Sequence, residues 1–75
     1  MKGFILPATQ LDNAGIELGQ ILIDLGDVAA IAPRPSRGST IYLKSQYTFK
    51  VAESVDLLLQ EIMEAERVRY GSDEV

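Results

Sequence analysis

Large apolar and polar residues alternate along two neighbouring stretches in the middle of the chain, residues 41–44 and 47–51. Because successive side chains of a strand point to opposite faces, this alternation predicts a β-hairpin. The connection near Ser45-Gln46 lacks the Asn-Gly or Asp-Gly pair that two-residue turns favour, so its type stays open. The inner face would carry Ile41, Leu43, Tyr47, Phe49 and Val51, and the outer face Thr40, Tyr42, Lys44, Thr48 and Lys50.

After Val51 the apolar spacing changes to that of a helix. Ser54 has the hydroxyl that suits a helix start, Arg67 and Arg69 suit the negative end of the helix dipole, and Gly71 is a natural stop. The apolar arc comprises Val55, Leu58, Leu59, Ile62, Met63 and Ala65, and the acidic side Asp56, Glu61, Glu64 and Glu66.

Leu57 projects away from this apolar arc. It is either a single exposed leucine, which is common, or a contact for a partner or a second subunit. The acidic side has two interpretations as well. It either keeps the helix soluble or presents negative charge to a basic partner.

The remaining segments add strands before the hairpin. Residues 2–8 indicate a short strand that Pro7 ends or confines to an edge, and residues 9–15 indicate a turn. An alternating run begins at residue 16, where Gly19 marks a bulge or a break, and a tight corner follows at residues 25–27. Residues 28–32 form another short strand, and the two prolines of residues 33–38 indicate a loop.

The predicted fold class is therefore α+β: a small curved antiparallel sheet of four to five strands with one C-terminal amphipathic helix packed on it. Residues 1–70 form a single domain in this interpretation, and residues 71–75 a frayed tail. A chain of 75 residues without cysteine has neither disulfides nor a thiolate zinc site to stabilise it, so we expect a homo-oligomer. No apolar run is long enough to span a membrane, and a cytoplasmic location is the simplest expectation.

Charge is segregated along the chain. Residues 28–52 hold four basic residues and no acid, whereas the rest holds all eleven acids and three bases. Arg34 and Arg37, with Ser36, Ser39 and the Gly38 backbone as further donors, form a candidate anion site. Tyr42 and Lys44 on the outer hairpin face would extend it. The alternative is a solvated loop whose charges pair with acids of the same chain or of another subunit.

Catalysis is not indicated. The chain has no histidine and no cysteine, which removes the commonest general base, metal ligand and nucleophile pairs. No phosphate-binding or metal-binding motif is present. Asp24 lies within an apolar run, but the alternation places it on the outward, solvated face. The sequence predicts a non-enzyme without a cofactor or metal.

The segment 23–62 resembles a recurring pattern in small proteins, in which a short strand leads to a hairpin and then to "E-S-V-x-x-I-x-x-x-I". It is similar to small flagellar and swarming-motility regulatory proteins, to phage and prophage proteins and, more distantly, to LytTR-type DNA-binding domains. Residues 51–55, Val-Ala-Glu-Ser-Val, are its most specific part. Those proteins usually carry a glycine in the hairpin turn, where this chain has Ser45-Gln46. The resemblance implies the sheet-plus-helix architecture and a regulatory or phage-accessory role.

We therefore expect a small regulatory protein that acts by binding another protein, with a phage-type inhibitor or accessory factor as one form of this role. One alternative is a nucleic-acid-binding transcriptional regulator that uses the basic hairpin of residues 34–50. The other is an oligomeric binder of a small anionic ligand. The candidate binding residues are Arg34, Arg37, Tyr42, Lys44 and Leu57.

Overall fold

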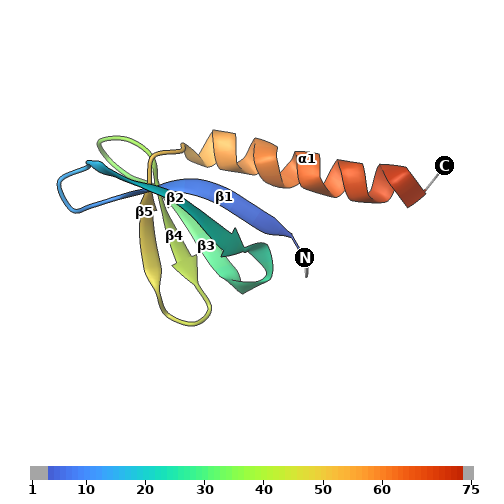
Figure 1. The fold of residues 1–75 in the computed structure, drawn as a ribbon, viewed down its shortest axis with the longest axis horizontal. Coiled ribbons are helices and arrows are strands. Elements are labelled where there is room, and N and C mark those ends of the chain that lie inside the picture. The colour runs from blue at the N-terminus through green and yellow to red at the C-terminus, as the bar shows by residue number, and fades with distance from the viewer. Residues whose placement is uncertain (1–3, 74–75) are drawn as a thin grey trace.

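The structure is a computed structural model that describes residues 4–73, with side chains as far as residue 66. Five strands are followed by one helix (Figure 1), which confirms the predicted α+β class. The elements are β1 Ile5–Leu11, β2 Glu17–Asp24, the 3₁₀ turn η1 Leu25–Asp27, β3 Val28–Pro33, β4 Ser39–Leu43, β5 Thr48–Val51 and α1 Val55–Asp73.

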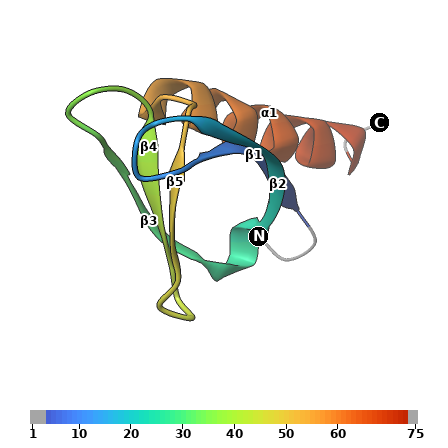
Figure 2. The same cartoon turned by 60° about the vertical axis from the view of Figure 1, so that its left-hand side comes forward.

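The five strands form one antiparallel sheet in the order β2-β1-β5-β4-β3. The two edge strands, β2 and β3, are consecutive in the chain and are joined by the tight corner η1. The sheet must therefore curve until its edges approach each other at that corner, and Figure 2 shows the resulting half-open barrel. All neighbouring strands are consecutive in the chain except β1 and β5.

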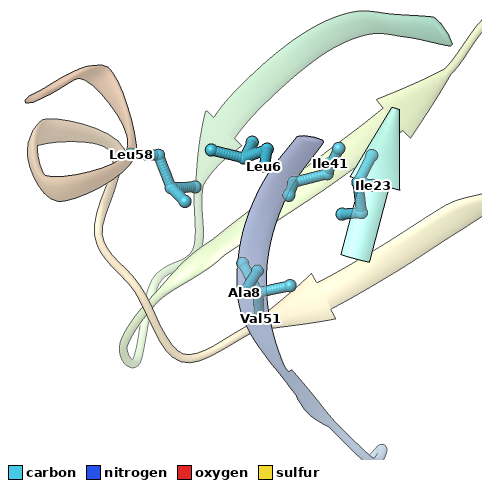
Figure 3. Close-up of a cluster of buried hydrophobic side chains, with 6 residues drawn as sticks. All are labelled: Leu6, Ala8, Ile23, Ile41, Val51 and Leu58. Atoms are coloured by element: carbon cyan, nitrogen blue, oxygen red, sulfur yellow. The ribbon is translucent and has the colours of Figure 1, made fainter. Parts of the chain in front are cut away.

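The core lies on the concave side of this sheet, where one helix residue meets five strand residues (Figure 3). Alternate strand positions point inward, as the sequence pattern predicts. The central cluster comprises Leu6, Ala8, Ile23, Ile41, Val51 and Leu58. Leu58 is fully buried, so α1 is attached to the sheet mainly through its first turns.

The predicted apolar arc of α1 is only half covered. Val55 and Ile62 are partly buried beside Leu58, but Leu59 is 50% exposed and Met63 58% exposed. The expectation that the whole arc faces the core is wrong for these two residues, because Leu59 and Met63 lie on the flank of the helix that the core does not cover.

The two ends of α1 differ in how well the sequence predicts them. Ser54 caps the start as predicted, since its hydroxyl accepts a hydrogen bond from the Leu57 N–H at 3.1 Å. At the other end the helix continues past the predicted stop at Gly71 to Asp73. Residues 74–75 of the predicted tail lie outside the described residues.

Strand β1 is displaced from its predicted position. The predicted strand at residues 2–8 begins outside the described residues, and the observed strand continues to Leu11, through part of the predicted turn. Thr9 is held in the strand by long-range contacts. Its N–H and hydroxyl donate to the two oxygens of the Glu53 carboxylate at 2.8 and 2.9 Å, and its carbonyl accepts from the Ala52 N–H.

Pro7 lies inside β1, although β1 is not an edge strand of the sheet. It lies opposite Leu22 of β2, but β1 meets β5 in only one ladder pair, Gln10 with Val51. The half of β1 that contains Pro7 thus has a strand neighbour on one side only. The predicted edge environment applies locally, which explains why a residue without an N–H is tolerated there.

The predicted bulge at Gly19 and the predicted tight corner at residues 25–27 are confirmed. The register between β1 and β2 shifts opposite Gly19, as expected for a bulge, and η1 forms the tight corner. Asp24 is exposed and its carboxylate accepts from the Gly26 N–H at 2.9 Å, capping that corner.

The turn between β4 and β5 places Gln46 in the left-handed region, with φ 76°. The Gln46 N–H donates to the Leu43 carbonyl, and the Leu43 N–H donates to the Tyr47 carbonyl. This is the three-residue hairpin loop in which the left-handed position usually belongs to glycine. Tyr47 is part of the turn and 70% exposed, so the prediction that it faces the core is wrong.

The loop before β4 is packed against the end of β5. Gly38 has φ 75°, and a Cβ there would lie far inside contact distance of the Val51 carbonyl oxygen. Ser39 is fully buried, and its hydroxyl donates to the Glu53 carbonyl at 2.7 Å. Ser39 is therefore not available to the anion site that the sequence suggests.

Replacing Gly38 with alanine should lower the free energy of unfolding by about 3 kcal/mol or more, because the new Cβ adds a backbone clash to an unfavourable φ. Chemical denaturation measures the effect. Gly15→Ala is the matched control: Gly15 has φ 86° but no atom within 4 Å of the added Cβ, so only about 1 kcal/mol should be lost. Equal losses in the two variants would contradict the close approach to Val51.

Replacing Gln46 with glycine should raise the free energy of unfolding by about 0.5–1 kcal/mol, since glycine adopts a positive φ without steric cost. Thermal or chemical denaturation measures the change. Ser45→Gly, one residue earlier at a negative φ, is the control and should destabilise by a similar amount. A loss of stability in Gln46→Gly would rule out the left-handed turn.

Candidate functional site

The outer face of the β4–β5 hairpin carries the polar residues that the sequence places there. Thr40 pairs with Lys50 and Tyr42 with Thr48 across the two strands. Directly opposite residues of an antiparallel pair share a face, so these four side chains form one surface. Tyr42 is 44% exposed on it, which leaves its ring accessible to a partner.

Lys44 is separated from the arginine loop. It lies in the turn beyond the end of β4, whereas Arg37 precedes the start of that strand. At about 3.3 Å per residue, the two positions are roughly 20 Å apart. Lys44 instead neighbours η1, since its N–H donates to the Asp27 carbonyl at 2.7 Å. The two ends of β4 therefore cannot form one compact anion site.

The arginine loop, residues 34–38, is held partly by its own contacts. The Arg34 N–H donates to the Gly38 carbonyl at 3.1 Å, and the Arg34 guanidinium donates to the Arg37 carbonyl at 3.4 Å. Arg37 forms an exposed ion pair with Glu17 at 3.5 Å. This pair agrees with the solvated-loop alternative for Arg37. Exposed pairs of this kind contribute little to stability, so an anionic ligand could still compete for the guanidinium.

Lys50, not Lys44, shares the arginine end of the molecule. Its ammonium group donates to the Asn13 side chain at 2.8 Å, beside the turn that leads to Glu17. The two segments enclose an open hollow of about 450 Å³. Its lining residues are Gln10, Leu11, Asp12, Asn13, Leu18, Thr48 and Lys50. Nothing in the sequence pattern indicates this hollow, because its walls come from residues almost forty positions apart.

The exposed part of α1 is a second candidate surface. Leu57 is 45% exposed, as its position opposite the apolar arc predicts, and it lines a shallow hollow of about 230 Å³ with Gln60, Glu61 and Glu64. Leu59 and Met63 are exposed on the other flank of the helix. These two are four residues apart and are therefore neighbours on the helix surface.

The five predicted site residues are thus distributed over four places. Arg34 and Arg37 share the loop before β4, Tyr42 lies on the outer hairpin face, Lys44 lies at the opposite turn, and Leu57 lies on α1. Only the two arginines are brought together. Sequence reasoning missed Leu59 and Met63 as surface residues, because an apolar arc alone does not tell how much of it the sheet covers.

Within residues 4–73, no group of three or more acidic side chains is arranged to hold a metal ion. The helix described here is not apolar enough to cross a membrane. Searches against protein-family models, curated proteins and solved structures find no match to this chain.

Proposed function

We propose that this protein is a small non-enzymatic regulatory protein that acts by binding another protein, and that α1 is its main docking element. One observation carries the proposal: α1 has 19 residues, is buried against the core through Leu58, and leaves Leu57, Leu59 and Met63 exposed. Helices in proteins gain most of their stability from packing of an apolar face. A helix of about 28 Å that extends past its own sheet therefore favours a partner.

The surface area of the chain supports this interpretation. The protein measures 47 × 23 × 20 Å and exposes 5200 Å². A compact protein of its mass would expose about 4,500 Å². The chain thus exposes roughly 700 Å² more than a compact protein of its mass, as expected when one element projects from the sheet.

The charge of α1 defines the chemistry of the partner. The helix contains five acids and two bases, and the acids dominate its first part, where residues 55–66 contain four acids and no base. Leu59 and Met63 supply two apolar anchors one turn apart, as in helices that lie in a groove of their target. The partner we propose is therefore a protein with an apolar groove rimmed by basic groups. Complementary charge of this kind mainly speeds association and selects the partner.

The two alternatives that the sequence leaves open have less support from the geometry. Arg37 pairs with Glu17, an acid that an anionic ligand or a nucleic acid would have to displace, and Lys50 donates to the neutral Asn13 side chain. Arg34 and Lys44 lie at opposite ends of β4. A phage-type inhibitor or accessory factor would fit a small, acidic, helix-presenting protein, and a cytoplasmic location stays a prediction.

Replacing both Leu59 and Met63 with glutamate should weaken binding of the partner at least about tenfold, because both anchors are lost and like charge is added. The measurement is capture of binding proteins from a cell lysate on the immobilised wild type and variant, with the amount of each retained protein compared. Tyr47→Glu is the matched control. Tyr47 is more exposed than Leu59 and Met63, but it lies on the hairpin turn, so its variant should retain the partner.

Two results would contradict the proposal. A protein retained equally by the wild type and by the Leu59→Glu/Met63→Glu variant would exclude α1 as the docking element. Loss of the same protein in Arg34→Glu/Arg37→Glu, with no effect of the helix variant, would assign binding to the arginine loop instead. Retained nucleic acid that is released steeply by salt would favour the nucleic-acid alternative.

A further inference from the structure

The edge strand β2 has one side without a strand neighbour. It is paired with β1 along all of its length and ends the sheet on the other side. A free edge presents backbone N–H and C=O groups that can pair with another chain, and proteins usually protect such edges with lysine, proline or a bulge. Strand β2 contains no lysine and no proline. Its bulge at Gly19 lies near its start and its two charged residues, Glu17 and Asp24, lie at its ends, so residues 20–23 form a regular segment without a protecting charge.

An exposed apolar patch lies beside this segment on the outer face of the sheet. Leu22 is 70% exposed and lies opposite Pro7 of β1. Ile5 is 55% exposed and lies opposite Asp24, one diagonal step from Leu22. Side chains in directly opposed and diagonal positions are in reach of each other. The patch therefore continues from β1 to the open edge.

We propose that residues 20–24 of β2 pair antiparallel with the same residues of a second copy of this chain, around a two-fold axis at Leu22. In this register Leu22 lies opposite Leu22 of the second copy. Gln20 lies opposite Asp24 of the second copy, so an amide donor meets a carboxylate acceptor twice. A strand edge that is complementary to itself in both apolar and polar positions suits an isologous dimer.

The dimer joins the two sheets into one and brings the Leu22 side chains of both copies together, so the two patches form one continuous apolar strip on the outer face. Dimerisation would also help to stabilise a chain of only 75 residues, which has no cysteine and therefore no disulfide. The proposed interface and α1 are different surfaces, so this inference does not rest on the proposed function. If both hold, each dimer carries two docking helices, which increases avidity for a partner with two sites.

A cysteine at position 22 tests the axis directly. The chain has no cysteine, so Leu22→Cys introduces a single thiol. Directly opposed residues of an antiparallel pair have Cβ atoms about 4.5–5.5 Å apart, close to the separation that a disulfide spans. Mild oxidation should therefore convert most of this variant to a covalent dimer. Leu59→Cys is the control, because it also replaces an exposed leucine with a single cysteine but does so on α1. It should stay largely monomeric under the same conditions.

A second variant tests the dimer interface without any oxidation step. Analytical ultracentrifugation of the wild type should show a monomer–dimer equilibrium, and Leu22→Lys should raise its dissociation constant by roughly tenfold or more. Tyr47→Lys, at the same 70% exposure but in the hairpin turn, should leave the equilibrium unchanged. Added salt should favour the dimer, because each copy carries a net charge of −4.

A wild type that is monomeric at high micromolar concentration would overturn the proposal. So would a dimer that Leu22→Lys does not weaken, or cross-linking of Leu59→Cys as complete as that of Leu22→Cys. The helix variant Leu59→Glu/Met63→Glu distinguishes the two proposals, since it should lose the heterologous partner and still form the β2 dimer.

Discussion

The carboxylate of Glu53 joins parts of the chain that are far apart in sequence. The two carboxylate oxygens accept hydrogen bonds from the N–H and the hydroxyl of Thr9. The backbone carbonyl of Glu53 accepts a hydrogen bond from the hydroxyl of buried Ser39. A partly buried donor that loses its acceptor costs more than the bond itself contributes. One residue between the last strand and the helix cap therefore links β1, the start of β4 and the chain entering α1, in addition to the ladder pair of Gln10 with Val51.

The strand and helix periods predict the architecture because they report local packing. The alternation around Ile41 and Phe49, the helix cap at Ser54, the bulge at Gly19 and the corner at residues 25–27 are all visible in the sequence. The predictions that failed, such as the end of β1, depend on contacts between residues far apart in the sequence. Thr9 stays in β1, where it pairs with Gln20 of β2 and also donates hydrogen bonds to Glu53, 44 residues later. Sequence periodicity carries no information on such contacts.

The candidate site is less predictable than the fold for a geometric reason. A cluster of basic residues in sequence becomes a cluster in space only if the backbone turns back, and β4 does the opposite by carrying Lys44 away from Arg37. Exposure of Leu59 and Met63 depends on which side of the apolar arc meets the core, which the helical period does not encode. The residues that emerge as the main candidates are thus apolar ones that the sequence assigns to the core.

The single ladder pair between β1 and β5 has a consequence for the dynamics of the sheet. The β1–β2 hairpin is joined to the rest of the sheet by Gln10 opposite Val51, by the contacts of Thr9 and by core side chains, whereas β4 forms five ladder pairs with β3 and four with β5. Proteins open locally in cooperative units of this size. In a monomer, the backbone amides of β1 and β2 should therefore exchange with solvent deuterium together, and before those of β4.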